Sequence, residues 1–76
     1  MGKFTKITHQ TNLTPGTQIR RPNSSGEYEY YLIGEHIMAD NKYEVYPGGK
    51  DYLQTGILLY YRLQDMINQN CEYWAD

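Results

Sequence analysis

The sequence predicts an α+β fold in which a small antiparallel sheet of three to four strands packs against one C-terminal amphipathic helix. Residues 27–38 alternate between two sets of side chains, as in a half-buried strand. Clusters of Pro, Gly, Asn and Ser separate this segment from other short apolar runs. Apolar residues at helical spacing then follow between residues 51 and 69.

Two short strands are expected in the first third of the chain. The first candidate, residues 3–8, places Phe4 on one face and Ile7 on the other. Pro15 and Gly16 then favour a type II turn, because Pro fixes φ and Gly accepts a positive φ. Residues 17–21 form the second candidate strand.

The strongest strand signal lies at residues 27–38, directly after a hairpin loop expected at residues 23–26. The alternation assigns six residues to two faces: Tyr28, Tyr30 and Leu32 on one, and Glu29, Tyr31 and Ile33 on the other. Gly34 interrupts the pattern and indicates a bulge or bend. Residues 43–46 are expected to form the next short strand.

The helix is expected at residues 51–69. At about 100° per residue its apolar side chains form a stripe about 140° wide, enough to pack against a sheet. Asp51 is a suitable N-cap, and Asn68 and Asn70 are suitable stop residues. Gly56 costs about 1 kcal/mol in helix propensity, so a hairpin across residues 47–50 is the alternative for the start of this segment. Residues 71–76 are expected to be a short tail.

Composition and length exclude several classes of protein. The 76 residues predict a single domain over residues 1–76. The longest apolar run, residues 57–61, is far shorter than the run of about 20 residues in a transmembrane helix, so no membrane partner is expected. Cys71 is the one cysteine, which excludes an internal disulfide. This free thiol and the absence of an apolar leader predict a cytoplasmic protein.

No catalytic or cofactor-binding constellation emerges, so we expect a protein that is not an enzyme and has neither metal nor cofactor. His9, His36 and Cys71 are scattered, whereas structural zinc sites use closely spaced pairs of ligands. Gly-rich phosphate-binding motifs are absent.

Charge is distributed unevenly along the chain. Seven basic and nine acidic residues give a net charge of −2. Four of the basic residues, and no acidic ones, lie in residues 1–25: Lys3, Lys6, Arg20 and Arg21. Basic groups beside aromatic rings are how single-stranded nucleic acids are held, so a small nucleic-acid-binding β domain is the alternative function. It is the weaker one, because four cations on an acidic chain make few phosphate contacts.

The leading expectation is a protein-binding module, an inhibitor or adaptor that occludes a larger protein partner. Ile57, Leu58 and Tyr61 would form an apolar ridge on the outer side of the predicted helix, and adjoining exposed apolar residues indicate a contact site. Three tyrosines of the sheet would support this contact: Tyr28, Tyr30 and Tyr31. The ridge could also join two copies in a homo-dimer or lie buried within one copy. The chain's size is typical of accessory proteins of phages and mobile elements.

Overall fold

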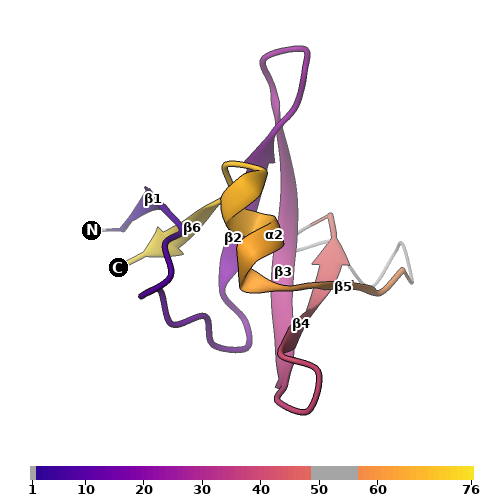
Figure 1. The fold of residues 1–76 in the computed structure, drawn as a ribbon. Helices are drawn as coiled ribbons and strands as arrows, with labels where there is room; N and C mark the ends of the chain where they lie inside the picture. The colour runs from indigo at the N-terminus through magenta and orange to yellow at the C-terminus, as the bar shows by residue number, and fades with distance from the viewer. Residues whose placement is uncertain (1, 49–56) are drawn as a thin grey trace.

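The computed structural model of the chain describes residues 2–48 and 57–76. Its strands form one antiparallel sheet in the order β1-β6-β2-β3-β4-β5 (Figure 1). The strands are β1 (Lys3–Lys6), β2 (Gln18–Pro22), β3 (Tyr28–Ile37), β4 (Lys42–Pro47), β5 (Leu59–Tyr61) and β6 (Glu72–Ala75). A short helix, α2 (Leu63–Asn68), lies between β5 and β6 and packs on one side of β2 and β3.

The predicted fold class is wrong. The sheet has six strands rather than three to four, and the expected C-terminal helix is replaced by the six residues of α2. Within the predicted helix, residues 59–61 form β5 and pair with β4, whereas residues 51–56 lie outside the described residues. The prediction of a short tail at residues 71–76 is also wrong. This segment contains β6, which lies between β1 and β2 in the sheet.

Local signals at both ends of α2 explain its short length. The backbone of Arg62 is extended, with φ −82° and ψ 157°, and its N–H donates to the Asp65 carboxylate at 3.1 Å, as in a capping box. At the other end Asn70 has a φ of 60°. The N–H groups of Asn70 and Cys71 donate back to Ile67 and Met66, which is the Schellman arrangement. Within the described residues no helix is long and apolar enough to cross a membrane.

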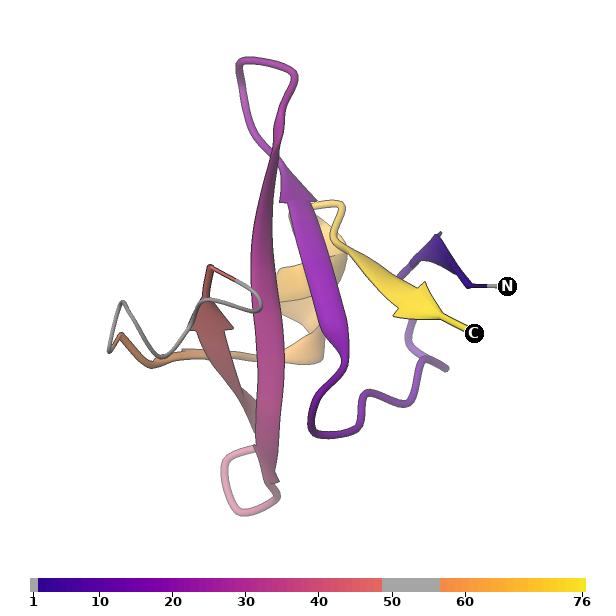
Figure 2. The same ribbon diagram turned by 180° about the vertical axis from the view of Figure 1, so that it is seen from behind.

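The turns of the first half match the sequence predictions. Gly16 has a φ of 92°, and the N–H of Thr17 donates to the carbonyl of Thr14 at 3.1 Å. In the loop between β2 and β3, the Asn23 side-chain oxygen accepts two backbone N–H groups, each at 3.0 Å. Gly26 closes that loop with a φ of 85°. The loop with Asn23 and Gly26 connects β2 and β3 into the long hairpin, which extends beyond the rest of the sheet (Figure 2).

The bulge predicted at Gly34 is confirmed. The register of β3 against β4 shifts between Ile33 and His36, so one extra residue lies on β3. A Cβ atom at Gly34 would lie 2.8 Å from the Tyr46 ring and 3.0 Å from the Glu44 Cβ. Glycine is therefore required here by the close approach of β4.

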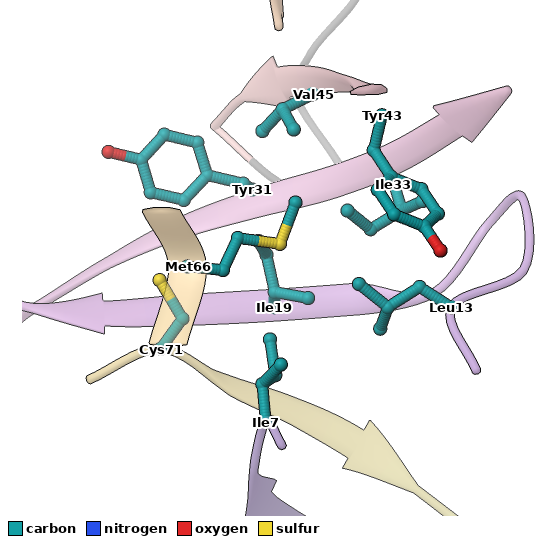
Figure 3. Packing of buried hydrophobic residues seen from close by; sticks show 9 residues of the cluster. All are labelled: Ile7, Leu13, Ile19, Tyr31, Ile33, Tyr43, Val45, Met66 and Cys71. Carbon is teal, nitrogen blue, oxygen red and sulfur yellow. The ribbon is translucent and has the colours of Figure 1, made fainter. Parts of the chain in front are cut away.

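The two faces of β3 differ in exposure, as the alternation predicts. Tyr31 and Ile33 are 6% and 1% exposed, whereas Tyr28 and Tyr30 are each 41% exposed. Met66 of α2 points into the buried side (Figure 3). The other residues of the core are Ile7, Leu13, Ile19, Tyr43, Val45 and Cys71. In the described part of the chain, the opposite face of the sheet is covered by no helix (Figure 2).

Candidate interaction surface on the open face of the sheet

Five side chains from four strands meet on the sheet face opposite α2. They are Phe4 of β1, Arg20 of β2, Tyr28 and Tyr30 of β3, and Trp74 of β6, and this set is termed the aromatic face. Strand pairing brings them together, because Phe4 lies opposite Trp74 and Arg20 lies opposite Tyr30. Period-two alternation then directs all five side chains to the same side of the sheet.

The rings of the aromatic face form one connected cluster around Arg20. The guanidinium carbon of Arg20 lies 4.2 Å from the ring centroid of Phe4 and 3.9 Å from that of Tyr28. Phe4 also contacts Trp74 edge-on, with centroids 5.2 Å apart, and Tyr30 at 6.1 Å. Such cation–π and edge-to-face contacts hold the rings in defined positions.

Arg20 forms an ion pair with a carboxylate of the same chain. Its Nε atom lies 2.6 Å from Oε1 of Glu72 on the neighbouring strand β6. Desolvation acts most strongly on the pKa of Arg20 and would lower it, but hydrogen bonds with Glu72 and Tyr30 outweigh that effect and raise it. Arg20 therefore stays charged and paired, and it supports the surrounding rings.

The aromatic face is exposed. Tyr28, Tyr30 and Trp74 are each 41% exposed, although all three are large side chains that proteins tend to cover. Isolated exposed apolar residues are common. A contiguous group of them on one face indicates a contact surface instead.

A cleft of about 660 Å³ opens beside Trp74. It is lined by residues 14–18 together with Leu32, Trp74 and Asp76. The indole Nε1–H of Trp74 donates to Oδ1 of Asp76 at 3.1 Å. Backbone passes close to the same ring, because a Cβ atom at Gly2 would lie 2.5 Å from the indole. The indole is thus held in place by Gly2 and by its hydrogen bond to Asp76.

The helical ridge predicted from Ile57, Leu58 and Tyr61 is not formed, because these residues precede α2 and Tyr61 belongs to β5. Ile57 is 52% exposed, Leu58 is half-buried, and Tyr61 is half-buried against the core. The three sheet tyrosines of the prediction divide between faces: Tyr28 and Tyr30 belong to the aromatic face, and Tyr31 belongs to the core.

The four basic residues that were candidates for contacting a nucleic acid do not form a single patch. Lys3 and Lys6 are exposed at the ends of β1. Arg20 and Arg21 are adjacent in β2, so they lie on opposite faces of the sheet. Arg21 pairs with Glu29 at 2.6 Å on the side of α2.

Arg21 belongs to a network that connects the sheet to α2. Its Nη1 donates to Oε1 of Gln69, directly after the helix, at 3.1 Å. The Tyr31 hydroxyl donates to Oε2 of Glu29 at 2.8 Å. This hydrogen bond and the pairing with Arg21 lower the pKa of Glu29, and burial raises the pKa of Tyr31. The contacts of this network lie within the chain, and we assign it a structural role.

His36 and Cys71, two of the three possible ligands for a soft metal, lie in different surroundings. His36 stacks on Tyr43 with centroids 4.3 Å apart, and its Nε2 lies 3.1 Å from Oδ1 of Asn41. Cys71 is 4% exposed, and burial raises the pKa of its thiol. Among residues 2–48 and 57–76, no group of three or more His, Cys, Asp or Glu side chains could hold a metal ion.

Comparison of the chain with protein-family models, with curated proteins and with solved structures finds no match. The candidate surface therefore depends on the geometry alone. Sequence reasoning misses Phe4 and Trp74 as members of it, because the sequence predicts a tail where β6 forms. The one available signal was the alternation of residues 72–75, in which Glu72 and Trp74 share a face.

Proposed function

We propose that this protein is a non-enzymatic protein-binding module of the cytoplasm, an inhibitor or adaptor, and that the aromatic face is its contact surface. The observation that carries this proposal is the exposure of Tyr28, Tyr30 and Trp74, 41% each, on a sheet face that no described helix covers. Tyr, Trp and Arg are the residue types that most often dominate the binding energy of protein interfaces.

The order within the aromatic face supports this function. Arg20 lies between the rings of Phe4 and Tyr28 and is held by Glu72. Side chains that are already fixed lose little conformational entropy when a partner covers them. Tyrosine adds to this advantage, because its contact area depends on only two side-chain torsions.

A protein partner fits this surface better than a nucleic acid does. Affinity for nucleic acids depends on cations that contact phosphates. Two of the four basic candidates already form ion pairs within the chain: Arg20 with Glu72, and Arg21 with Glu29. The aromatic stacking that a single strand would need is present, but much of the positive charge is neutralised.

Affinity capture with matched variants tests the proposal. The bait is the whole chain as wild type, as Tyr30→Ser, or as Met38→Ser, a control in the turn after β3 that is 82% exposed. We expect a partner that wild type and Met38→Ser retain equally and that Tyr30→Ser loses. A hot-spot loss of about 2 kcal/mol corresponds to about a 30-fold weaker Kd.

Two controls separate the alternatives. Circular dichroism must show that the Tyr30→Ser variant is folded. Nuclease treatment of the lysate should leave capture unchanged. Capture that disappears after nuclease treatment, or that falls steeply with salt on added RNA or DNA, would instead identify a nucleic-acid-binding protein. Equal retention by all three baits would contradict the assignment of the surface.

A further inference from the structure

The chain holds its own Arg20 in a site made of aromatic rings and a carboxylate. The guanidinium lies 4.2 Å and 3.9 Å from the ring centroids of Phe4 and Tyr28. The carboxylate is that of Glu72, at 2.6 Å. This combination satisfies both the flat face and the charged edge of a guanidinium.

Arg21 repeats the combination on the other side of the sheet. Its guanidinium carbon lies 5.6 Å from the ring centroid of Tyr31, and its Nη2 lies 2.6 Å from Oε2 of Glu29. Ring and carboxylate are themselves connected, because the Tyr31 hydroxyl donates to the same Glu29 oxygen. Both arginines of β2 are therefore held by a ring together with a carboxylate.

A third pair of this kind borders the cleft on the open face. The Trp74 indole N–H donates to Asp76 at 3.1 Å, which places an aromatic ring beside a carboxylate. Both residues line the cleft of about 660 Å³. Among the described residues, no cation lies against this indole and no ion pair reaches Asp76. Tryptophan is the strongest of the aromatic residues in cation–π contacts.

The rest of the cleft suits the stem of an arginine side chain. Leu32 and Pro15 supply apolar lining, and Gln18 and two threonines supply neutral polar lining. Asp76 is the one lining residue that carries a formal charge. An anionic ligand is therefore disfavoured. A side chain with an apolar stem and a planar cationic head matches the walls and the charge together.

We propose that the cleft between residues 14–18 and Trp74 receives an arginine side chain of the protein partner, with its guanidinium stacked on the indole and paired with Asp76. This inference rests on the proposed function, and it names the chemistry of the contact. It also agrees with the charge of the chain, because residues 26–76 contain nine acidic and three basic residues. Complementary charge selects basic partners.

Nuclear magnetic resonance titration of the ¹⁵N-labelled chain tests the inference without the partner. The probes are N-acetyl-arginine amide, N-acetyl-lysine amide and N-acetyl-citrulline amide, a neutral analogue of arginine with nearly the same shape. Trp74 is the only tryptophan in the sequence, so its indole N–H signal is assigned without ambiguity. We expect arginine to shift this signal and the backbone amide signals of Thr14, Gly16, Thr17 and Gln18. Its affinity should be at least about fivefold above that of citrulline, since charge supplies the cation–π attraction.

Variants assign the effect to the carboxylate. Asp76→Asn should reduce the affinity for the arginine probe to that for citrulline. Asp40→Asn, a control in the turn between β3 and β4, should leave the arginine affinity unchanged. Equal binding of arginine and citrulline, shifts outside the cleft, or no shift at about 20 mM probe would overturn the inference, because a lone side chain is expected to bind with a Kd on the order of millimolar.

The outcomes for the two proposals can be told apart. Loss of capture by Tyr30→Ser together with no arginine binding would keep the aromatic face as the contact surface and remove the arginine. Arginine binding in the cleft without any dependence of capture on Tyr30 would keep the cleft and remove the wider surface.

Discussion

Tyr30 and Tyr31 are neighbours in β3 that lie on opposite faces of the sheet, so alanine at each position provides a matched comparison. Their exposures are 41% and 6%, a difference of 35%. For a side chain of about 200 Å², this difference corresponds to about 70 Å² of additional buried surface at Tyr31. At about 25 cal/mol per Å², burying that surface contributes about 1.8 kcal/mol to stability. Tyr31→Ala also leaves a cavity and removes the hydroxyl that donates to Glu29.

We therefore expect Tyr31→Ala to lose about 2–3 kcal/mol more stability than Tyr30→Ala, out of a total of about 4–11 kcal/mol for a chain of this length. Urea denaturation followed by circular dichroism measures both values. In thermal melts this difference in stability between the two variants corresponds to a Tm difference of about 8–24 °C. Equal losses would mean that Tyr30 is as well covered as Tyr31, and the reasoning about an open face would be refuted.

Three further results are expected. Gly34→Ala should destabilise the chain by about 1–3 kcal/mol in the same assay, since its Cβ would lie 2.8 Å from a tyrosine ring, and an unchanged Tm would contradict the bulge. Cys71 should react with a thiol reagent at least about 100-fold more slowly in the native chain than in urea. Burial both shields the thiol from the reagent and raises its pKa, so equal rates in the two states would contradict the structure. Hydrogen bonds from the Tyr31 hydroxyl and from Arg21 lower the pKa of Glu29 below its usual value of 4.5. The stability that the ionised Glu29 contributes is therefore fully present above pH 4.5 and is lost as the pH falls through the lower pKa of the folded state. Glu29→Gln should flatten the dependence of urea stability on pH in this acidic range, and an unchanged slope would argue against the network.

The first half of the fold could be predicted because its signals are local. Gly16, Asn23 and Gly26 each belong to a turn whose backbone geometry favours that residue type. The two faces of β3 follow from period-two alternation, and Gly34 marks the bulge. These features depend on residues close together in the chain, so no knowledge of distant pairing was needed.

The second half could not be predicted in the same way. The apolar run at residues 57–61 fits a buried strand as well as a helix, and periodicity cannot separate the two in so short a run. The helical pattern predicted for residues 51–69 spans both β5 and α2. The capping interaction between Arg62 and Asp65 places the helix start, but Arg is not one of the residue types that mark an N-cap in a sequence.

The candidate surface depends on contacts between the two ends of the chain. Lys3 pairs with Ala75 across β1 and β6, and Arg20 bonds to Glu72, 52 residues further along the chain. Neither contact leaves a local trace in the sequence. The tyrosine content indicated protein recognition, but the membership of Phe4 and Trp74 depends on this pairing of distant strands.

Hydroxyl-radical footprinting of the chain, alone and with its captured partner, shows whether the aromatic face is the contact surface. The method reads the oxidation of Tyr, Trp and Met side chains, so Met38, which is 82% exposed, is an internal control. We predict that the partner protects Tyr28, Tyr30 and Trp74 and leaves the oxidation of Met38 unchanged. Protection of Met38 with continued oxidation of Tyr30 and Trp74 would show that the partner binds elsewhere.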